Sequence, residues 1–245
     1  MSTAATDSRA AAPKIPRHPS KWLADALELA AELLVAEYST RADRSPLLVL
    51  DPFAGVGGIH RLRELTNGTV QTVGLELEPE WSAAHPGTIA GDVLAMPAEW
   101  VDRFDAVVTS PCYGNRMADA HDARDASRRN TYRHALGRQL SPGSAAGMQW
   151  GREYRRFHRD AMLAVLRVLR PGGLIAWNVK NHYRAGVEQL VAEWHLRQWL
   201  ELGVRLVHVV DVAARGNRQG ENGDLRTEAE FVFVLRAPAG PPALL

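Results

Sequence analysis

The chain contains 245 residues, of which 29 are Lys or Arg and 28 are Asp or Glu, so its formal net charge is only +1. This balance gives no global electrostatic argument for nucleic-acid binding, and the single cysteine, Cys112, excludes an intrachain disulfide and a cysteine-based zinc site. No apolar run approaches the roughly 20 residues that span a bilayer, so we expect a cytoplasmic protein without membrane contact. The length fits one α/β domain, which we place at residues 15–236 between flexible ends at 1–14 and 237–245.

Apolar periodicity along the chain alternates between helical and strand patterns. The predicted helices are 22–36, 59–65, 152–169 and 186–202, and the predicted strands are 47–50, 70–77, 87–93, 104–109, 174–179, 204–212 and 231–236. The last two strands follow each other without a helix, which predicts an antiparallel hairpin. The alternation before them favours a doubly wound, mostly parallel α/β sheet with helices on both faces and this hairpin at its C-terminal end.

A glycine-rich string, Asp51-Pro-Phe-Ala-Gly-Val-Gly-Gly58, follows the first predicted strand. Gly55 and Gly57 allow the backbone to turn tightly and approach a ligand, and ligands of open parallel sheets bind beyond the carboxyl ends of the strands. Glu76, near the end of the second strand, has the spacing of a carboxylate that receives a ribose diol. Asp92 and Val93, after the third strand, are placed to contact an adenine ring. Some turns of this kind only allow close packing, so the string alone does not identify a cofactor.

A second string, Ser110-Pro-Cys-Tyr113, follows the strand at 104–109. The lone pair of an exocyclic base amine is delocalised into the ring, so a catalyst must accept the amine hydrogens and hold the nitrogen in line with the donor. Ser110 Oγ and the carbonyl of Pro111 supply two acceptors, and Tyr113 supplies a ring that stacks on an extruded base. This chemistry requires no metal.

Together the two strings resemble the motifs of the amino-directed DNA methyltransferases, which use S-adenosylmethionine to methylate N4 of cytosine or N6 of adenine. The motif order resembles compact phage or orphan enzymes of this group. The resemblance implies a class I, Rossmann-like methyltransferase fold and direct methyl transfer to DNA. Serine in the first motif position is more frequent in the N4-cytosine enzymes, so N4 of cytosine is favoured over N6 of adenine.

The same resemblance assigns the cofactor-binding residues. It implies that Asp51, Pro52, Phe53 and Ala54 form the cofactor turn together with the glycines. It also implies that Lys21, within His18-Pro-Ser-Lys-Trp22, pairs with the carboxylate of the cofactor, although an ordinary helix entry explains that segment equally well.

Cys112 departs from the family pattern, which usually has a second proline there. Three alternatives therefore stay open: an RNA base methyltransferase, a C5-cytosine methyltransferase with Cys112 as nucleophile, and a degenerate protein that binds cofactor and nucleic acid without chemistry. The segments that acid catalysis in the C5 enzymes requires are not seen in the sequence.

Two arginine-rich segments are the candidate target-recognition elements, one at 114–151 and one at the hairpin loop 213–228. Arginine among polar and aromatic residues suits phosphate and base-edge contacts, although solvated loops without sequence reading have the same composition. The predicted nucleic-acid contacts are Asn115, Arg116, Arg128, Arg129 and Arg218 in these segments and Asn178 and Lys180 at the end of the fifth strand.

Overall fold

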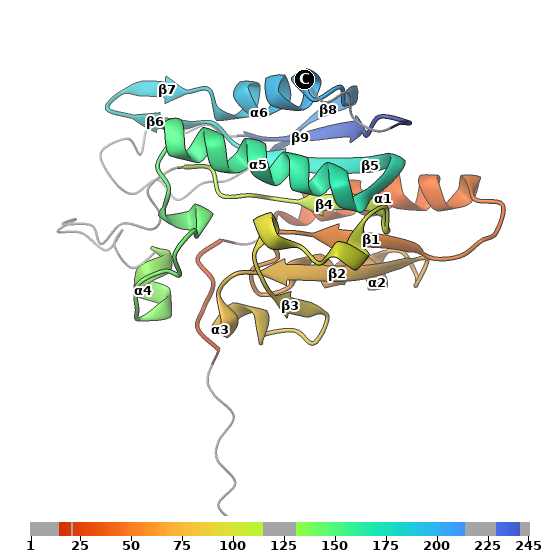
Figure 1. Cartoon of the computed structure of the whole chain (residues 1–245), viewed down its shortest axis with the longest axis horizontal. Helices are drawn as coiled ribbons and strands as arrows, with labels where there is room; N and C mark the ends of the chain where they lie inside the picture. The colour runs from red at the N-terminus through yellow and green to blue at the C-terminus, as the bar shows by residue number, and fades with distance from the viewer. Residues whose placement is uncertain (1–14, 21, 115–130, 214–228, 241–245) are drawn as a thin grey trace, which may run out of the picture.

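The computed structural model describes residues 15–20, 22–114, 131–213 and 229–240. Its main sheet has seven strands in the order β3-β2-β1-β4-β5-β9-β8 (Figure 1). The parallel strands are β1 (Leu47–Asp51), β2 (Val70–Glu76), β3 (Thr88–Ala90), β4 (Phe104–Thr109) and β5 (Leu169–Val179). β9 (Ala229–Arg236) lies antiparallel to both β5 and β8 (Arg205–Ala213). The predicted doubly wound, mostly parallel sheet with a C-terminal hairpin is therefore confirmed.

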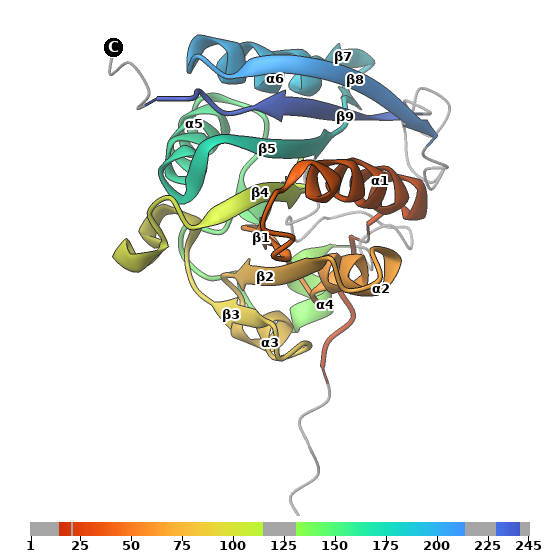
Figure 2. The ribbon, with the colours of Figure 1, turned by 90° about the vertical axis from the view of Figure 1, so that its right-hand side faces the viewer.

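Helices cover both faces of this sheet, as Figure 2 shows. α1 (Ala24–Thr40) and α2 (Leu62–Leu65), which continues the 3-10 turn η1 (Gly58–Arg61), pack on one face, and α5 (Arg152–Val168) and α6 (Val191–Glu201) pack on the other. Successive strand residues point to opposite faces, so Val49 joins the core under α1 whereas Leu50 joins the core under α5. Burial of both faces explains why the central strands are continuous apolar runs.

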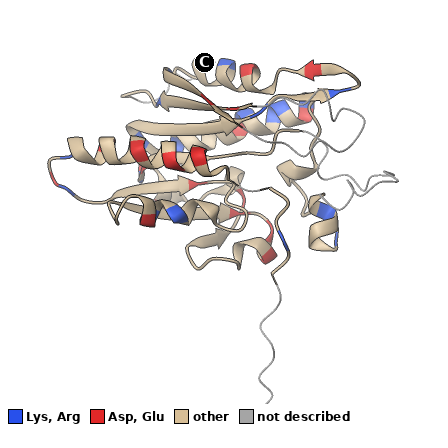
Figure 3. Cartoon of the chain, turned by 180° about the vertical axis from the view of Figure 1, so that it is seen from behind, with Lys and Arg blue, Asp and Glu red and all other residues tan. Residues whose placement is uncertain are grey.

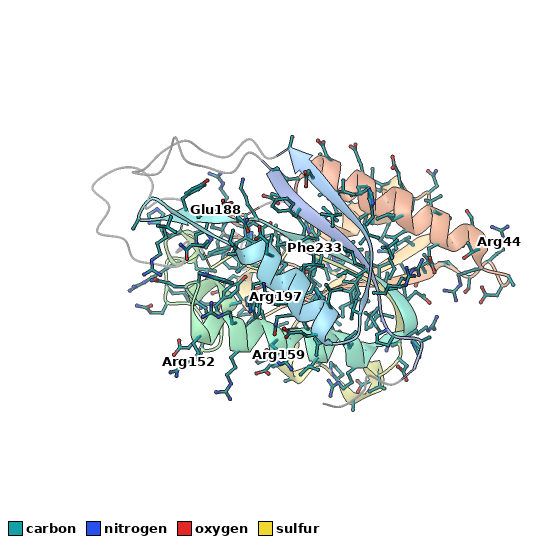
Figure 4. All side chains as sticks on the ribbon, turned by 90° about the horizontal axis from the view of Figure 1, so that it is seen from above. Arg44, Arg152, Arg159, Glu188, Arg197 and Phe233 are labelled. Carbon is teal, nitrogen blue, oxygen red and sulfur yellow. The ribbon has the colours of Figure 1, made fainter. Side chains whose placement is uncertain are left out.

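The outer surfaces of the helices are polar. Figure 4 shows Arg152 and Arg159 on α5 and Arg197 on α6, which are exposed, whereas Phe233 of β9 is buried between the sheet and its helices. The described part of the chain contains no helix that is both long and apolar enough to cross a membrane.

Shorter elements occupy the connections. These are α3 (Pro79–Ser82), η2 (Val93–Ala95), η3 (Ala98–Trp100), α4 (Tyr132–Leu136), η5 (Ala145–Gly147) and the hairpin of β6 (His182–Arg184) with β7 (Val187–Gln189). Of these, α4 lies beyond the carboxyl ends of β1 and β2 (Figure 1).

Some predicted boundaries were wrong. The helix predicted at 186–202 begins only at Val191, because Ala185 and Gly186 form the two-residue turn of the β6–β7 hairpin with φ angles of 49° and 76°. Positive φ at both turn residues matches the twist of a hairpin and cannot start a helix. The strand predicted at 174–179 begins earlier, because β5 already pairs with β4 at Leu169, directly after α5.

Hydrogen bonds also connect the residues after β9 to the first part of β5. The backbone N–H of Ala237 donates to the carbonyl of Gly173, and the N–H of Gly172 donates to the carbonyl of Pro238. Contacts with the sheet therefore continue to Pro238 among the described residues.

Candidate active site

A glycine-rich turn follows β1 at the carboxyl edge of the sheet. Gly55 and Gly57 have φ angles of 53° and 79°, which glycine adopts without the strain that a Cβ adds. A Cβ on Gly57 would lie 2.8 Å from both His60 and His85, and one on Gly55 would lie 3.1 Å from His18. The turn therefore needs glycine at both positions for its conformation and for space.

Glu76 holds this turn against the end of β2. Its Oε2 accepts a hydrogen bond from the N–H of Gly55, and its Oε1 accepts one from the N–H of Glu78, each at 2.9 Å. Burial raises the pKa of the Glu76 carboxyl to about 7, while the two backbone hydrogen bonds act in the opposite direction. A desolvated carboxylate beside the glycine turn is a strong acceptor, so its position fits the predicted recognition of ribose hydroxyls.

Asp51 is fully buried and joins three segments. Its Oδ1 accepts from the hydroxyl of Thr109 at 2.6 Å and from the N–H of Phe53 at 3.0 Å, and its Oδ2 accepts from the indole N–H of Trp22 at 3.3 Å. Burial raises the pKa of Asp51 to about 6, and these hydrogen bonds oppose the rise. Asp51 thus fixes the glycine turn, the end of β4 and the N-terminal segment to one another.

The N-terminal segment lies across the glycine turn. The ring of His18 is 4.5 Å from Trp81 and 5.2 Å from Tyr132 between ring centroids. A Cβ on Gly58 would lie 2.9 Å from Cδ1 of Trp22. These contacts place the segment beside the glycine-rich turn.

The other predicted cofactor residues have internal contacts. The N–H of Ala54 donates to the carbonyl of Leu75 at 3.0 Å, next to the buried Pro52. The ring of Phe53 lies 6.3 Å from the rings of both Phe157 on α5 and Trp177 on β5, measured between centroids. At the end of β3, Asp92 Oδ1 accepts from the N–H of Leu94 and caps η2, where Val93 is buried.

The Ser110–Tyr113 turn follows β4 at the same edge and belongs to a hydrogen-bonded cluster with Asn178 and Glu230. Ser110 Oγ lies 2.7 Å from Tyr113 Oη, and Tyr113 Oη donates to Glu230 Oε2 at 2.9 Å. Asn178 Nδ2 donates to the same Glu230 oxygen at 2.7 Å and lies 3.4 Å from Ser110 Oγ. Glu230, from β9, was not predicted from the sequence.

Asn178 contributes a further buried acceptor. Its Oδ1 is buried, and no donor among the described residues reaches it. Buried acceptors without donors are rare and call for an explanation.

A second chain of hydrogen bonds holds the Ser110–Tyr113 turn from the helix layer. The indole N–H of Trp177 donates to His195 Nδ1 at 3.0 Å, so the neutral His195 ring carries its proton on Nε2. That Nε2–H donates to Tyr154 Oη at 2.9 Å, and the hydroxyl of Tyr154 donates to the carbonyl of Cys112 at 2.7 Å. Burial keeps the pKa of His195 well below its usual range, which maintains the neutral ring that this chain requires.

Cys112 is not activated as a nucleophile. Burial raises the pKa of its thiol to about 12, and the charge of Glu76 acts in the same direction. Only the thiolate attacks carbon efficiently. The raised pKa of the buried thiol therefore argues against the covalent C5 route.

The described part of the predicted recognition segment, 131–151, is anchored beside the cofactor turn. Arg138 forms ion pairs with the buried Glu78 at 2.8 Å and with Glu80 at 2.5 Å. Glu78 also accepts from the N–H and the hydroxyl of Ser141. Figure 3 shows basic residues near α4, whereas acidic residues run along α1.

The structure does not test every predicted contact. Lys180 directly follows β5, at the same edge as Asn178. Six predicted residues lie outside the described part of the chain: Lys21, Asn115, Arg116, Arg128, Arg129 and Arg218.

The fold matches known structures, although no protein-family model and no curated protein matches the sequence. The chain superposes on TrmN from Thermus thermophilus with 18% identity and a TM-score of 0.51, covering 86% of this chain but only 48% of TrmN. It superposes on the [4+2]-cyclase SpnF with 14% identity and a TM-score of 0.52, covering 90% and 85% of the two chains. A SAM-dependent methyltransferase from Aquifex aeolicus aligns at 12% identity, 87% and 93% coverage and a TM-score of 0.48.

The superpositions on TrmN and SpnF agree with the strand order and show a Rossmann-like α/β fold. The chain spans about half the length of TrmN. Because one similar structure is a cyclase, the fold by itself does not determine the reaction, which has to be argued from the site.

Proposed function

We propose that this protein is an S-adenosylmethionine-dependent methyltransferase that acts on an exocyclic amine of a DNA base, by direct transfer to an extruded base. N4 of cytosine is favoured over N6 of adenine by the serine at position 110. The proposal rests on the Ser110–Tyr113 turn and on the glycine turn at the same sheet edge.

The observation that carries the proposal is the direction of the hydrogen bonds at Ser110. The single proton of the Tyr113 hydroxyl is donated to the Glu230 carboxylate. The bond between Ser110 and Tyr113 is therefore donated by Ser110. This leaves the two lone pairs of Ser110 Oγ as acceptors, one of them for the Asn178 amide at 3.4 Å. An acceptor at this atom is what an exocyclic amine needs in order to localise its own lone pair.

The glycine turn fits the proposed cofactor. Gly55 and Gly57 allow close approach of a ligand to the backbone, Glu76 offers a buried carboxylate to ribose hydroxyls, and Phe53 joins this turn to the layer behind the catalytic turn. When bound, S-adenosylmethionine supplies an electrophilic methyl group on a sulfonium. The residues of the chain then orient the amine, accept its hydrogens and exclude water.

RNA is the second candidate substrate, because the same catalytic turn acts on any unpaired base with an exocyclic amine. The two substrates differ in the contacts that surround the base. DNA is preferred here on the family resemblance of the two strings.

A tritium-transfer assay on DNA and RNA tests this function. We expect incorporation into DNA by the wild type, and a loss of about 100-fold or more in Ser110→Ala, because removal of one transition-state hydrogen-bond partner costs this much in comparable sites. Ser39→Ala, at an exposed serine near the end of α1 whose hydroxyl donates to the carbonyl of Val35, is the matched control. Mass spectrometry of the nucleosides then names the base and the atom.

The assay also separates the alternatives. Incorporation into RNA alone would assign the second substrate. Cofactor binding without incorporation into either polymer would contradict the enzyme proposal and favour a protein that binds without chemistry. Cys112→Ala is expected to keep full activity, because direct transfer does not use the thiol. Loss of all activity in this variant would instead indicate the covalent route.

A further inference from the structure

Methylation of an amine produces a proton that has to leave the site. When the nitrogen–carbon bond forms and the carbon–sulfur bond breaks, the amine nitrogen becomes positively charged and one of its N–H protons must be removed. Ser110, the acceptor of an amine hydrogen, is a poor base by itself. A carboxylate that it reaches through one hydroxyl would solve this problem.

Glu230 is such a carboxylate. It reaches the catalytic turn from β9, whose Phe231 and Val232 pair with Val179 and Asn178 at the end of β5. Its Oε2 accepts from Tyr113, which in turn accepts from Ser110. The two hydrogen bonds are 2.7 and 2.9 Å long, which suits transfer of protons along them.

Among the described residues, the carboxylates of Asp51 and Glu76 accept hydrogen bonds from groups other than Ser110 and Tyr113. Asp51 accepts hydrogen bonds from Thr109, Phe53 and Trp22. Glu76 accepts from two backbone N–H groups of the cofactor turn. Glu230 is the carboxylate that the Ser110 hydroxyl reaches through Tyr113.

On the basis of the function proposed above, we propose that Glu230 is the terminal proton acceptor of methyl transfer, through a relay from Ser110 and Tyr113. The amine proton passes to Ser110 Oγ, the Ser110 proton passes to Tyr113 Oη, and the Tyr113 proton passes to Glu230 Oε2. The methylated amine and both hydroxyls end neutral, and the Glu230 carboxyl ends protonated. Asn178, which donates to the same carboxylate oxygen, is a positioning residue of the relay.

Tyr113 acts in this relay without accumulating as a phenolate. Burial and the neighbouring Glu230 charge raise the pKa of Tyr113 well above its usual range. A phenolate intermediate is therefore costly, so its proton leaves as the Ser110 proton arrives.

Glu230→Gln separates proton acceptance from positioning. The amide oxygen of glutamine still accepts hydrogen bonds from Tyr113 and Asn178, but it does not take up a proton. We expect kcat on DNA to fall by about 100-fold, which is typical for loss of general base catalysis. The Kd of the cofactor and the KM of DNA should stay within roughly twofold of wild type, since binding is not altered.

Two further variants sharpen this test. Asp211→Asn removes a negative charge from the exposed part of the neighbouring strand β8 and should leave kcat unchanged. Tyr113→Phe interrupts the relay one step earlier, so Tyr113→Phe combined with Glu230→Gln should be no slower than the slower single variant.

The possible outcomes are distinct. A Glu230→Gln enzyme that keeps a kcat within roughly threefold of wild type would overturn the relay, as would additive losses in the double variant. No incorporation by the wild type on any nucleic acid would instead overturn the proposed function and the relay with it. A melting curve and the cofactor Kd establish that each variant is folded.

Discussion

The proposed site has two parts at one edge of one sheet. We call the glycine turn with Glu76 the cofactor half, and the Ser110–Tyr113 turn with Asn178 and Glu230 the catalytic half. The two halves are held in different ways. In the cofactor half, Glu76 reaches back 21 residues to the N–H of Gly55, and most contacts are to the backbone. In the catalytic half, Tyr113 reaches forward 117 residues to Glu230, and the contacts join side chains. One half is thus built by its own strand–turn–strand unit, and the other needs most of the chain.

Asp51 and Phe53 join these halves. The Asp51 carboxylate binds Thr109 at the end of β4, and the Phe53 ring packs near Trp177 of β5. The catalytic turn is held from the opposite side by Tyr154. On the proposed function, substitutions in the cofactor half should mainly alter cofactor binding. Substitutions in the catalytic half should mainly alter the rate of chemistry.

The largest effect in the cofactor half is expected at Gly57. Gly57→Ala combines a positive φ with a Cβ only 2.8 Å from His60 and His85, so we expect a loss of about 2–4 kcal/mol in unfolding free energy and weaker cofactor binding. Urea unfolding and calorimetric titration measure the two effects. Gly68→Ala is the matched control, since Gly68 has a φ of 78° but no atom within 4 Å of its Cβ position. Equal losses in both variants would show that packing at the turn is unimportant.

A smaller effect is expected from Tyr154→Phe in the catalytic half. The variant removes the donor to the Cys112 carbonyl and leaves the buried Nε2–H of His195 without its acceptor, which should cost about 1–3 kcal/mol in unfolding free energy. Because the turn loses its fixed position, kcat should also fall, whereas the cofactor Kd should not change. Tyr38→Phe, which loses an exposed hydroxyl bond to Arg44, is the control and should alter neither. A changed cofactor Kd in Tyr154→Phe would argue against the independence of the two halves.

The smallest effect concerns the pH dependence of the cofactor half. The Glu76 pKa of about 7 is raised above its ordinary value of 4.5, so its contribution to stability is full below about pH 4.5 and is lost as the pH rises through 7. Glu76→Gln should therefore lose less melting temperature between these two pH values than the wild type, by a few degrees. The test compares the pH slopes of the two proteins because other groups also change stability with pH. Burial lowers the pKa of His60 to about 4, so its contribution to stability changes in the opposite direction, but it is the same in both proteins. Equal pH slopes would contradict the raised Glu76 pKa.

The parts of the site that the sequence predicted are those with local signals. The two strings stand at strand ends, and Glu76 stands at the end of the next strand, so chain order alone brings them to one edge. Asn178 was placed correctly at the end of β5 for the same reason.

Glu230 could not be predicted in this way. Its contact with Tyr113 depends on the register of β9 against β5, and the predicted strand began at 231, two residues after the start of β9 at Ala229. A signal does exist, because a hairpin strand that returns antiparallel to β5 begins at the carboxyl edge, which places an acidic residue at its start beside the site. Helical spacing places Tyr154 and His195 on the buried faces of α5 and α6, but it does not give their hydrogen-bond partners, because those come from other elements.

The long reach of Glu230 has a consequence for biosynthesis. The cofactor turn and its carboxylate emerge from the ribosome close together, and Gly55 can meet Glu76 as soon as β2 has paired with β1. The Ser110–Tyr113 turn has to wait until residue 230 has been made and β9 has inserted between β5 and β8. The hydrogen bond between Tyr113 and Glu230 can therefore form only after the last strand is in place, whereas the contact between Gly55 and Glu76 can form much earlier in synthesis.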